Sequence, residues 1–488
     1  MPRPAIVWFR DDLRVSDNPA LSAAVARGGP VVPVYVHEHP EDGTRPMGGA
    51  SQWWLHHSLA SLSRDLAALG APLAILRGPA GAAIPALARS IGASLVTWNR
   101  RYGLTERELD TEVKTALRRH EIEAESSNAA LLYEPWTVKS KTGAPLKVFS
   151  PFWRAALAGG EPKAPLPAPR RIPGLGADPS AGVGAVSLDD LRLLPTKPDW
   201  SGGLRETWTP GEAGAQARLA AFLAEGFKGY GSLRDRPDLP ATSALSPYLR
   251  FGEIGPRQIW HAAAFAVAEG RTNASTSDLA KFQSELGWRE FSYHLLFYHP
   301  DLARVNFQPR FDGFPWRSDP AGVEAWRRGR TGYPIVDAGM RQLWRTGWMH
   351  NRVRMIAASF LIKDLLVDWR VGEDWFWDTL VDADPASNAA SWQWVAGSGA
   401  DAAPYFRIFN PVSQGEKFDP QGDYVRRFVP ELARLPAEWI HRPWEAPAAV
   451  LSSAGLRLGV DYPRPIVDHA LARNRALGAV ESVKPNVN

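Results

Sequence analysis

The sequence predicts a two-part protein, in which an α/β domain with a doubly wound parallel sheet precedes an all-α domain. Short apolar runs alternate with helical stretches over residues 1–130, as in parallel sheets that are buried on both faces. A stretch rich in Pro, Gly and Ala follows at 158–212, and helical periodicity runs from about residue 213 to the C-terminus. We therefore expect an α/β domain at 1–130, an interdomain linker at 131–212 and a helical domain at 213–488.

Four apolar runs are the strand candidates of the first domain, AIVWF (5–9), VVPVYV (31–36), LAIL (73–76) and SLVTW (94–98). The clearest helix between them covers residues 50–69, where leucines recur at helical spacing, and Gly70 follows as its C-terminal cap. Ligands of such domains bind at the carboxyl ends of the strands. No GxGxxG or Walker loop follows any of these strands, so the pattern indicates neither a dinucleotide fingerprint nor an NTPase.

The second domain has helical patterns throughout and no strand pattern. The strongest is at 350–366, where apolar side chains form a continuous stripe. Pro334 and Gly347 mark helix ends nearby. The predicted helices are 213–225, 256–268, 276–298, 320–329, 335–346, 350–368 and 373–380.

Composition excludes several classes of protein. The chain of 488 residues has no cysteine, which excludes disulfides, thiolate zinc sites, iron–sulfur clusters and thiol catalysis. No apolar run approaches the roughly 18–20 residues that span a bilayer, and the N-terminus does not resemble a signal peptide. We expect no membrane association, no metal and a cytoplasmic location. The net charge of +4 is compatible with a polyanionic partner.

Tryptophan is unusually frequent, with 21 residues. Most tryptophans lie in hydrophobic cores, but they also provide stacking surfaces for planar ligands and relays for electrons. The seven tryptophans between residues 332 and 411 admit either interpretation.

Three clusters combine polar groups in a way that suits a ligand. In the helix at 276–298, Glu285 and Trp288 share one face, and Arg289 lies four residues after Glu285. This is either a salt bridge beside a core tryptophan or a carboxylate and an indole plane presented to a planar polar ligand. Hydroxyls before Pro247 either cap a helix or bind phosphate. Near residue 350, Asn351 and Arg354 share a face, and the carboxylates of Asp382 and Asp384 follow. These groups form a structural ion pair or hold a cofactor.

Six motifs together resemble the DNA photolyase/cryptochrome family, and they recur in the family's order over nearly the whole chain. They are IVWFRDDLRVSDNPAL, TSALSPYL, ELGWREFSYHLLFYHP, GYPIVDAGMRQLWRTGWMHNRVRM, DADPASNAASWQW and DAAPYFRIFNP. The resemblance implies an α/β antenna domain joined by a long linker to a helical domain that holds FAD. It implies that Asn388 faces flavin N5 and that Arg354 pairs with an Asp. The cofactor-binding residues that it implies are Tyr230, Thr242, Ser243, Ala244, Leu245, Ser246, Phe282, Arg354, Asp382, Ala383, Asp384 and Asn388.

The implied activity is light-driven DNA repair, in which reduced FAD donates an electron to a cyclobutane pyrimidine dimer, the dimer splits and the electron returns. Glu285 would bond the thymine edge, and Trp288 and Trp394 would pack against the flipped dimer. Trp392, Trp369 and Trp316 match the family's photoreduction chain. The DNA-binding residues that the resemblance implies are Arg234, Glu285, Trp288, Arg289, Asn351, Arg352, Met355 and Trp394.

Within the family, Asn388 favours repair, because plant-type cryptochromes usually carry at this position an Asp that can protonate flavin N5. The alternative is a cryptochrome-type blue-light photoreceptor. RPMGGASQWWLHHSL (45–59) resembles bacterial class III photolyases, which implies 5,10-methenyltetrahydrofolate as antenna, with Glu38, Arg45 and Trp53 as candidate ligands. Thr105–Glu106 and Ala303–Arg304 depart from the enterobacterial folate site, so a deazaflavin or an empty site stays open. We expect a monomer that binds damaged DNA with pyrimidine dimers.

Overall fold

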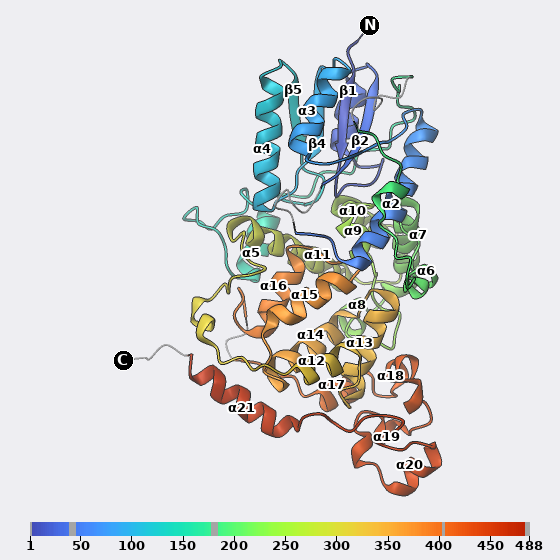
Figure 1. Ribbon diagram of the computed structural model, residues 1–488, viewed down its shortest axis with the longest axis vertical. Coiled ribbons are helices and arrows are strands. Elements are labelled where there is room, and N and C mark those ends of the chain that lie inside the picture. Colours follow the sequence, from blue (N-terminus) through green and yellow to red (C-terminus); the bar gives the residue numbers. More distant parts are fainter. Residues whose placement is uncertain (1, 39–44, 177–183, 403–405, 484–488) are drawn as a thin grey trace. The chain divides into compact units, whose positions relative to one another are not determined.

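The structure, a computed structural model, describes residues 2–38, 45–176, 184–402 and 406–483 (Figure 1). It contains two compact units, and each is assembled from separate stretches of the chain. The first comprises the chain up to Leu146, Ser150–Ala224 and Ser243–Pro300, and the second comprises Lys147–Phe149, Glu225–Thr242 and the chain from Asp301 onward. The functional division at residues 130 and 212 stays a prediction.

The first unit contains the predicted parallel sheet. Its strand order is β3-β2-β1-β4-β5, and every neighbouring pair is parallel. The order reverses at β1, and right-handed crossovers on either side of that point cover both faces of a sheet, as predicted for a doubly wound fold. The strands are β1 (Ala5–Phe9), β2 (Val31–His37), β3 (Ala74–Arg77), β4 (Leu95–Asn99) and β5 (Glu123–Ser127).

The four predicted strands are therefore confirmed to within a residue or two, whereas the sequence pattern does not predict β5. Its sequence, EAESS, has no apolar run, and its residues are half-buried or exposed. An edge strand of this kind lacks the apolar signal that buried strands carry. Backbone pairing with β4 holds it in the sheet.

The helices that directly follow β1, β3 and β4 pack against strands of the sheet. The predicted helix 50–69 is confirmed as α2, and Gly70 ends it in the left-handed conformation. Trp8 and Trp98 lie in the core of the sheet with ring centroids 5.7 Å apart. The helices are α1 (Pro19–Ala26), α2 (Gly49–Leu69), α3 (Ala80–Ser90), α4 (Leu104–Arg118), α5 (Phe149–Ala158), α6 (Gly202–Thr207), α7 (Glu212–Ala221), α9 (Ser246–Arg250), α10 (Pro256–Ala268) and α11 (Thr276–Tyr298).

The second unit is helical, as predicted, and in its described part no segment belongs to a sheet. One continuous core contains the apolar stripe of the 350–366 pattern together with Trp326, Trp369 and Trp392. Its helices are α8 (Tyr230–Leu233), α12 (Pro320–Arg327), α13 (Pro334–Thr346), α14 (Asn351–Ser359), α15 (Trp369–Thr379), α16 (Ser387–Ala396), α17 (Pro411–Phe418), α18 (Asp423–Phe428), α19 (Ala437–Ile440), α20 (Ala448–Ala454) and α21 (His469–Glu481).

The predicted helix at 350–368 is α-helical only at Asn351–Ser359, because the chain then widens into a π-helical turn at Phe360–Asp364. Lys363 and Asp364 are fully buried in this turn. Turns of this type occur often at functional sites. None of the helices in the described part of the chain is long and apolar enough to cross a membrane.

Candidate functional site

A largely buried ion pair organises the start of α14. Arg354 donates from Nη2 to both carboxylate oxygens of Asp382, at 2.8 and 3.1 Å, and from Nε to the carbonyl of Met349 at 2.7 Å. The Asp382 side chain is 3% exposed. A guanidinium that bonds both oxygens of a carboxylate fixes the orientation of both groups. The predicted pairing of Arg354 with an Asp is thus present in the structure.

Asp384 fixes the start of α16 and therefore the position of Asn388. Its Oδ1 accepts from the backbone N–H of Ala386 at 3.0 Å and of Ser387 at 2.7 Å, and its carbonyl accepts from the N–H of Asn388. A carboxylate at this place satisfies helix N–H groups that have no partner within the helix.

The side chain of Asn388 is buried and oriented by Glu373 of α15. Its Nδ2 donates to Glu373 Oε1 at 2.8 Å and to the Glu373 carbonyl at 3.1 Å. Glu373 itself is 1% exposed. Because the amide nitrogen is held by Glu373, the amide oxygen is the atom of Asn388 that is left for a ligand. The sequence patterns do not predict Glu373, whose only signal is an acidic residue in a helix rich in tryptophan.

The three predicted relay tryptophans are linked through α15. The Trp392 ring packs on Gly372 so closely that a Cβ atom there would overlap it. Trp369, three residues before Gly372, begins α15 and donates from Nε1 to Asn306 Oδ1 at 3.0 Å. The residue after Trp316, Arg317, donates its backbone N–H to the carbonyl of Leu366, just before α15.

The three tryptophans differ in solvent exposure. Trp392 is 2% exposed, Trp369 is fully buried, and Trp316 is partly exposed. Two buried indoles and one that is partly exposed are compatible with electron hopping between the surface and a buried cofactor.

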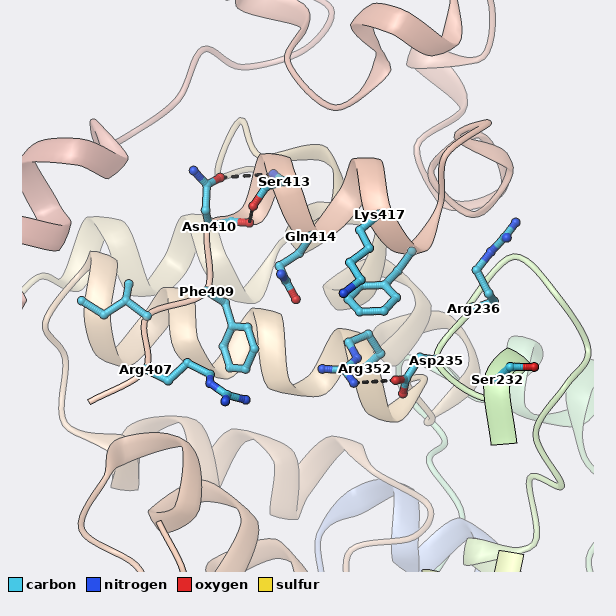
Figure 2. A pocket seen from close by; sticks show the side chains of 12 residues that line it. Ser232, Asp235, Arg236, Arg352, Arg407, Phe409, Asn410, Ser413, Gln414 and Lys417 are labelled. Carbon is cyan, nitrogen blue, oxygen red and sulfur yellow. Dashed lines mark hydrogen bonds and ion pairs between the residues drawn. The ribbon is translucent and has the colours of Figure 1, made fainter. Parts of the chain in front are cut away.

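A pocket of about 690 Å³ lies between α17, the start of α14 and the turn after α8 (Figure 2). Figure 2 shows Gln414 and Lys417 pointing from α17 toward Arg352. Arg352 pairs with Asp235 at 2.7 Å, and its guanidinium lies 4.5 Å from the centroid of the Phe418 ring. The lining includes four cationic side chains, Arg236, Arg352, Arg407 and Lys417.

Cationic, amide and aromatic groups together suit a phosphate-bearing ligand with planar rings. The sequence motifs indicate only Arg352 of these four cations. Arg407 lies within the DAAPYFRIFNP motif, but the motif alone does not distinguish it from a structural residue.

The other predicted residues of the second unit lie on these elements as well. Tyr230 begins α8 and is buried, and the guanidinium of Arg234 lies 5.7 Å from its ring centroid. Asn351 is exposed at the start of α14, and Met355 follows one turn later, half-buried. Trp394 donates from Nε1 to the carbonyl of Asp401 at 3.0 Å.

In the first unit, α11 carries Glu285, Trp288 and Arg289. Glu285 lies 2.9 Å from Lys281 Nζ, so a salt bridge to a residue one turn away exists, although the Glu285 side chain keeps 25% of its surface exposed. Trp288 is half-buried. Arg289 donates to the carbonyl of Ala130 at 2.6 Å and is thus engaged with its own chain. Phe282 is buried against Phe222, with ring centroids 4.9 Å apart.

The hydroxyl-rich stretch before α9 adopts an unusual backbone conformation. Ala244 has φ +49°, a left-handed conformation that is uncommon for residues other than glycine. Ser246 begins α9 and is exposed, whereas Leu245 is buried. Strained backbone of this kind persists where the surroundings fix it, often at ligand-binding sites. In the first unit, the hydroxyls and the left-handed turn of this stretch are groups that suit a phosphate-bearing ligand.

The three antenna candidates are engaged within the fold. Glu38 pairs with Arg101 at 3.2 Å. Trp53 is 1% exposed and packs on His57, with ring centroids 4.6 Å apart, so its ring offers no open face. Arg45 is half-buried. These residues do not fit a folate that stacks on Trp53. Among the described residues, no group of acidic, histidine or cysteine side chains could hold a metal ion.

Comparisons with known proteins identify the family of the chain. Residues 5–170 match the family model described as DNA photolyase, and residues 282–482 match the FAD binding domain of DNA photolyase. The chain is 53% identical to a deoxyribodipyrimidine photo-lyase of Agrobacterium fabrum, over 99% of this chain and 98% of that protein. It is 41% identical to cryptochrome-1 of Arabidopsis thaliana, over 96% of this chain and 69% of that protein.

A solved structure is equally similar. The crystal structure of a bacterial class III photolyase from Agrobacterium tumefaciens superposes with a TM-score of 0.94 at 53% identity, covering 99% of this chain and 98% of that chain.

Proposed function

This chain belongs to the DNA photolyase family, and we propose on that basis that it is a deoxyribodipyrimidine photo-lyase that splits cyclobutane pyrimidine dimers in DNA under blue light. The observation that carries the proposal is the 53% identity with the Agrobacterium fabrum photo-lyase over nearly the full length of both chains. The alternative, a blue-light photoreceptor, has weaker support, because the similarity to cryptochrome-1 of Arabidopsis thaliana is 41% and covers 69% of that protein.

FAD is held, in this proposal, by Tyr230, Thr242, Phe282 and the backbone and hydroxyls of Ser243–Ser246, together with Arg354 and Asp382–Asp384. When bound, reduced FAD supplies the photoexcited electron that splits the dimer and takes it back. Asn388 presents its amide oxygen to the flavin, because Glu373 holds its amide nitrogen at 2.8 Å. An amide cannot donate a proton as a carboxylic acid can, so this contact favours a flavin that stays deprotonated.

The dimer is bound by Glu285, Trp288, Asn351, Met355 and Trp394. Glu285 accepts hydrogen bonds from the pyrimidine edge, and the two indoles provide apolar planes that exclude water. Trp316, Trp369 and Trp392 carry electrons from the surface to the buried end of the row. This keeps the enzyme in its reduced form.

The DNA backbone is bound by Arg234 and by cations of the pocket in Figure 2, where Arg407 and Lys417 join the sequence-predicted Arg352. Phosphate contacts of this kind set affinity and register without reading sequence.

We further propose methenyltetrahydrofolate as an antenna, a monomeric state and a cytoplasmic location with nucleoid association when DNA is bound. The antenna rests on the resemblance to class III photolyases alone, because Glu38 and Trp53 are engaged within the fold and do not support it. The absorption spectrum of the purified protein tests it, because an added near-ultraviolet band is expected beside the flavin bands. Flavin bands alone would argue against it.

The repair activity is tested with the purified protein and reduced FAD. We expect tighter binding to a duplex with one thymine dimer than to the same duplex without it, and dimer loss only under blue light. Equal binding to both duplexes and no splitting under light would refute the proposal. A flavoprotein that photoreduces but repairs nothing would point to the photoreceptor alternative.

A further inference from the structure

Two adjacent residues of α11 form hydrogen bonds with the backbone of residues 130–133, which follow β5 in the chain. Arg289 donates from Nη1 to the carbonyl of Ala130 at 2.6 Å. Glu290 accepts at Oε2 from the N–H groups of Leu132, at 2.9 Å, and Tyr133, at 3.0 Å. Side chains of opposite charge thus bind a carbonyl and two N–H groups of one short stretch.

Both side chains are turned away from solvent. The Arg289 side chain is 12% exposed and lies over the Tyr293 ring, 4.8 Å from its centroid. Glu290 is 2% exposed, and its Oε1 has no hydrogen-bond partner among the described residues. Burial raises the pKa of Glu290 to about 7, although Arg289 and the two N–H groups oppose the shift. Burial of a carboxyl group costs free energy, and hydrogen bonds such as these have to offset that cost.

Local hydrogen bonds also fix the conformation of the backbone around residue 131. Asn128 closes it by accepting from the N–H of Leu131 at 3.0 Å and donating to the carbonyl of the same residue at 2.9 Å. The Tyr102 hydroxyl donates to Asn128 Oδ1 at 3.1 Å. Rotation or sliding of α11 relative to this stretch would break the three hydrogen bonds of Arg289 and Glu290 at once.

Glu285 lies one turn before Arg289 on the same helix, and Trp288 directly precedes Arg289. Residues three and four apart on a helix share a face, whereas adjacent residues point in different directions. Arg289, four residues after Glu285, lies on the same side of α11 as Glu285, whereas Glu290, five residues after Glu285 and two after Trp288, points away from both.

We propose that Arg289 and Glu290 are positioning residues that set the rotation of α11 and so hold Glu285 and Trp288 for the dimer. Arg289 is accordingly not a phosphate ligand. This inference rests on the proposed function, and it identifies Arg289 and Glu290 as the residues that keep the lesion-binding side chains in place.

The test compares Arg289→Gln, Glu290→Leu and Glu290→Gln in the FAD-loaded protein, on matched duplexes with and without a thymine dimer. Arg289→Gln and Glu290→Leu should each reduce the preference for the dimer by about tenfold, the effect of one lost hydrogen bond to a charged group. Glu290→Gln keeps an oxygen for both N–H groups and should stay within about twofold of the parent. Hydrogen exchange at the Leu132 and Tyr133 amides should accelerate in Glu290→Leu only.

Salt dependence separates positioning from phosphate binding. Arg289→Gln should leave the slope of log K against log salt unchanged, whereas Arg234→Gln, the matched control, should reduce its magnitude by about 0.9. Equal weakening of both duplexes with a reduced slope in Arg289→Gln would make Arg289 a phosphate ligand and overturn the proposal. Unchanged dimer preference in both Arg289→Gln and Glu290→Leu would also overturn it. If Glu290→Leu does not fold, Arg289→Gln decides alone.

Failure of the proposed function would look different, because the parent protein itself would then show no dimer preference. The exchange rates of Leu132 and Tyr133 would still report whether Glu290 anchors this stretch.

Discussion

At the scale of single residues, Glu285 is the side chain whose removal most directly separates lesion binding from folding. Its partner Lys281 is 42% exposed, so water can solvate the ammonium group when the carboxylate is absent. We expect Glu285→Ala to lower dimer splitting by roughly tenfold to a hundredfold, the range for loss of a charged hydrogen bond. Flavin absorbance and the melting temperature should stay close to those of the parent. Full activity in Glu285→Ala would remove Glu285 from the site.

In the Asn388–Glu373 pair, stability depends on the amide nitrogen of Asn388, which donates to the Glu373 carboxylate. Asn388→Asp replaces a donor at 2.8 Å with a second carboxylate, and two buried carboxylates so close cannot both ionise. The pair should therefore hold a proton, with a pKa raised above that of an ordinary Asp or Glu. Because a raised pKa gives stability that is lost as pH rises, the variant should lose roughly 1–3 kcal/mol of unfolding free energy more at pH 8 than at pH 5. Urea unfolding at both pH values measures this difference.

The double variant Asn388→Asp/Glu373→Gln is the matched control, since the introduced glutamine amide can donate to the new carboxylate. It should recover most of the stability at pH 8. An Asn388→Asp variant whose stability does not depend on pH would contradict the buried-pair geometry.

Residue types and order predict the Arg354–Asp382 pair but cannot predict Glu373 as the partner of Asn388. A motif shows which side chains are present, and only the crossing of α15 and α16 brings residues 373 and 388 together. Arg289 shows the opposite case. Its place beside Glu285 and Trp288 suggests a phosphate ligand, whereas its guanidinium bonds Ala130, which is 159 residues away in the sequence.

At the scale of elements, Gly372 allows α15 to approach the Trp392 ring. In Gly372→Ala the new methyl group would overlap that ring, so the ring or the helix has to move, at a cost of roughly 1–3 kcal/mol. We expect slower photoreduction of the flavin, as in Trp392→Phe, while repair by pre-reduced enzyme is nearly retained in both variants. Transient absorption under blue light measures the first quantity, and a single-turnover repair assay measures the second.

Gly478→Ala in α21 is the control for helix propensity. No described atom lies within 4 Å of the position of its added Cβ, so this change should stabilise the protein by up to about 1 kcal/mol. Photoreduction at the parent rate in Gly372→Ala would argue against Trp392 as the first relay residue, as would loss of repair in pre-reduced Trp392→Phe.

Glu253 joins α2 to the start of α7 inside the first unit. It is fully buried and accepts from Trp54 Nε1 at 3.1 Å and from the N–H of Gly211 at 2.6 Å, and burial raises its pKa to about 8. A raised pKa means that its contribution to stability is complete below about pH 4.5 and is lost as pH rises through about 8. The unfolding free energy should therefore fall between about pH 4.5 and pH 8 and level off above that, and Glu253→Gln should show a smaller fall. Equal pH dependence in both proteins would mean that Glu253 is not the titrating group.

Element boundaries are predicted best where the apolar period is strong. The helix at 276–298 has the bounds that its sequence pattern predicts. The pattern at 350–368 fails after Ser359, because a π-helical turn keeps the apolar stripe buried while changing the hydrogen bonds beneath it. Apolar periodicity reports which side chains are buried, and it does not report the hydrogen-bond register.

At the scale of the whole molecule, the net charge of +4 is modest, so DNA affinity has to come from where the cations gather. If the pocket in Figure 2 binds DNA as proposed, Arg407→Gln and Lys417→Gln should each reduce the slope of log K against log salt by about 0.9, the effect of one lost phosphate contact. Arg328→Gln is the control, since this exposed side chain lies outside the pocket and pairs with Glu324 one turn earlier. Fluorescence anisotropy over a salt series measures the slopes. An equal slope change in Arg328→Gln would make the effect one of net charge alone.

The polar edge strand β5 bears on how copies of this protein behave at high concentration. An open sheet edge can recruit the edge of another copy, and charged side chains discourage this. Glu123 and Glu125 alternate along β5, and Arg27 holds both from the same copy, at 2.8 and 2.7 Å. A second sheet that approached this edge would meet the Arg27–Glu123–Glu125 charge cluster on one face beside the hydrogen-bonding groups. We therefore expect the strand that lacks any apolar signal to disfavour fibrous aggregation, because its polar composition lets the sheet end there.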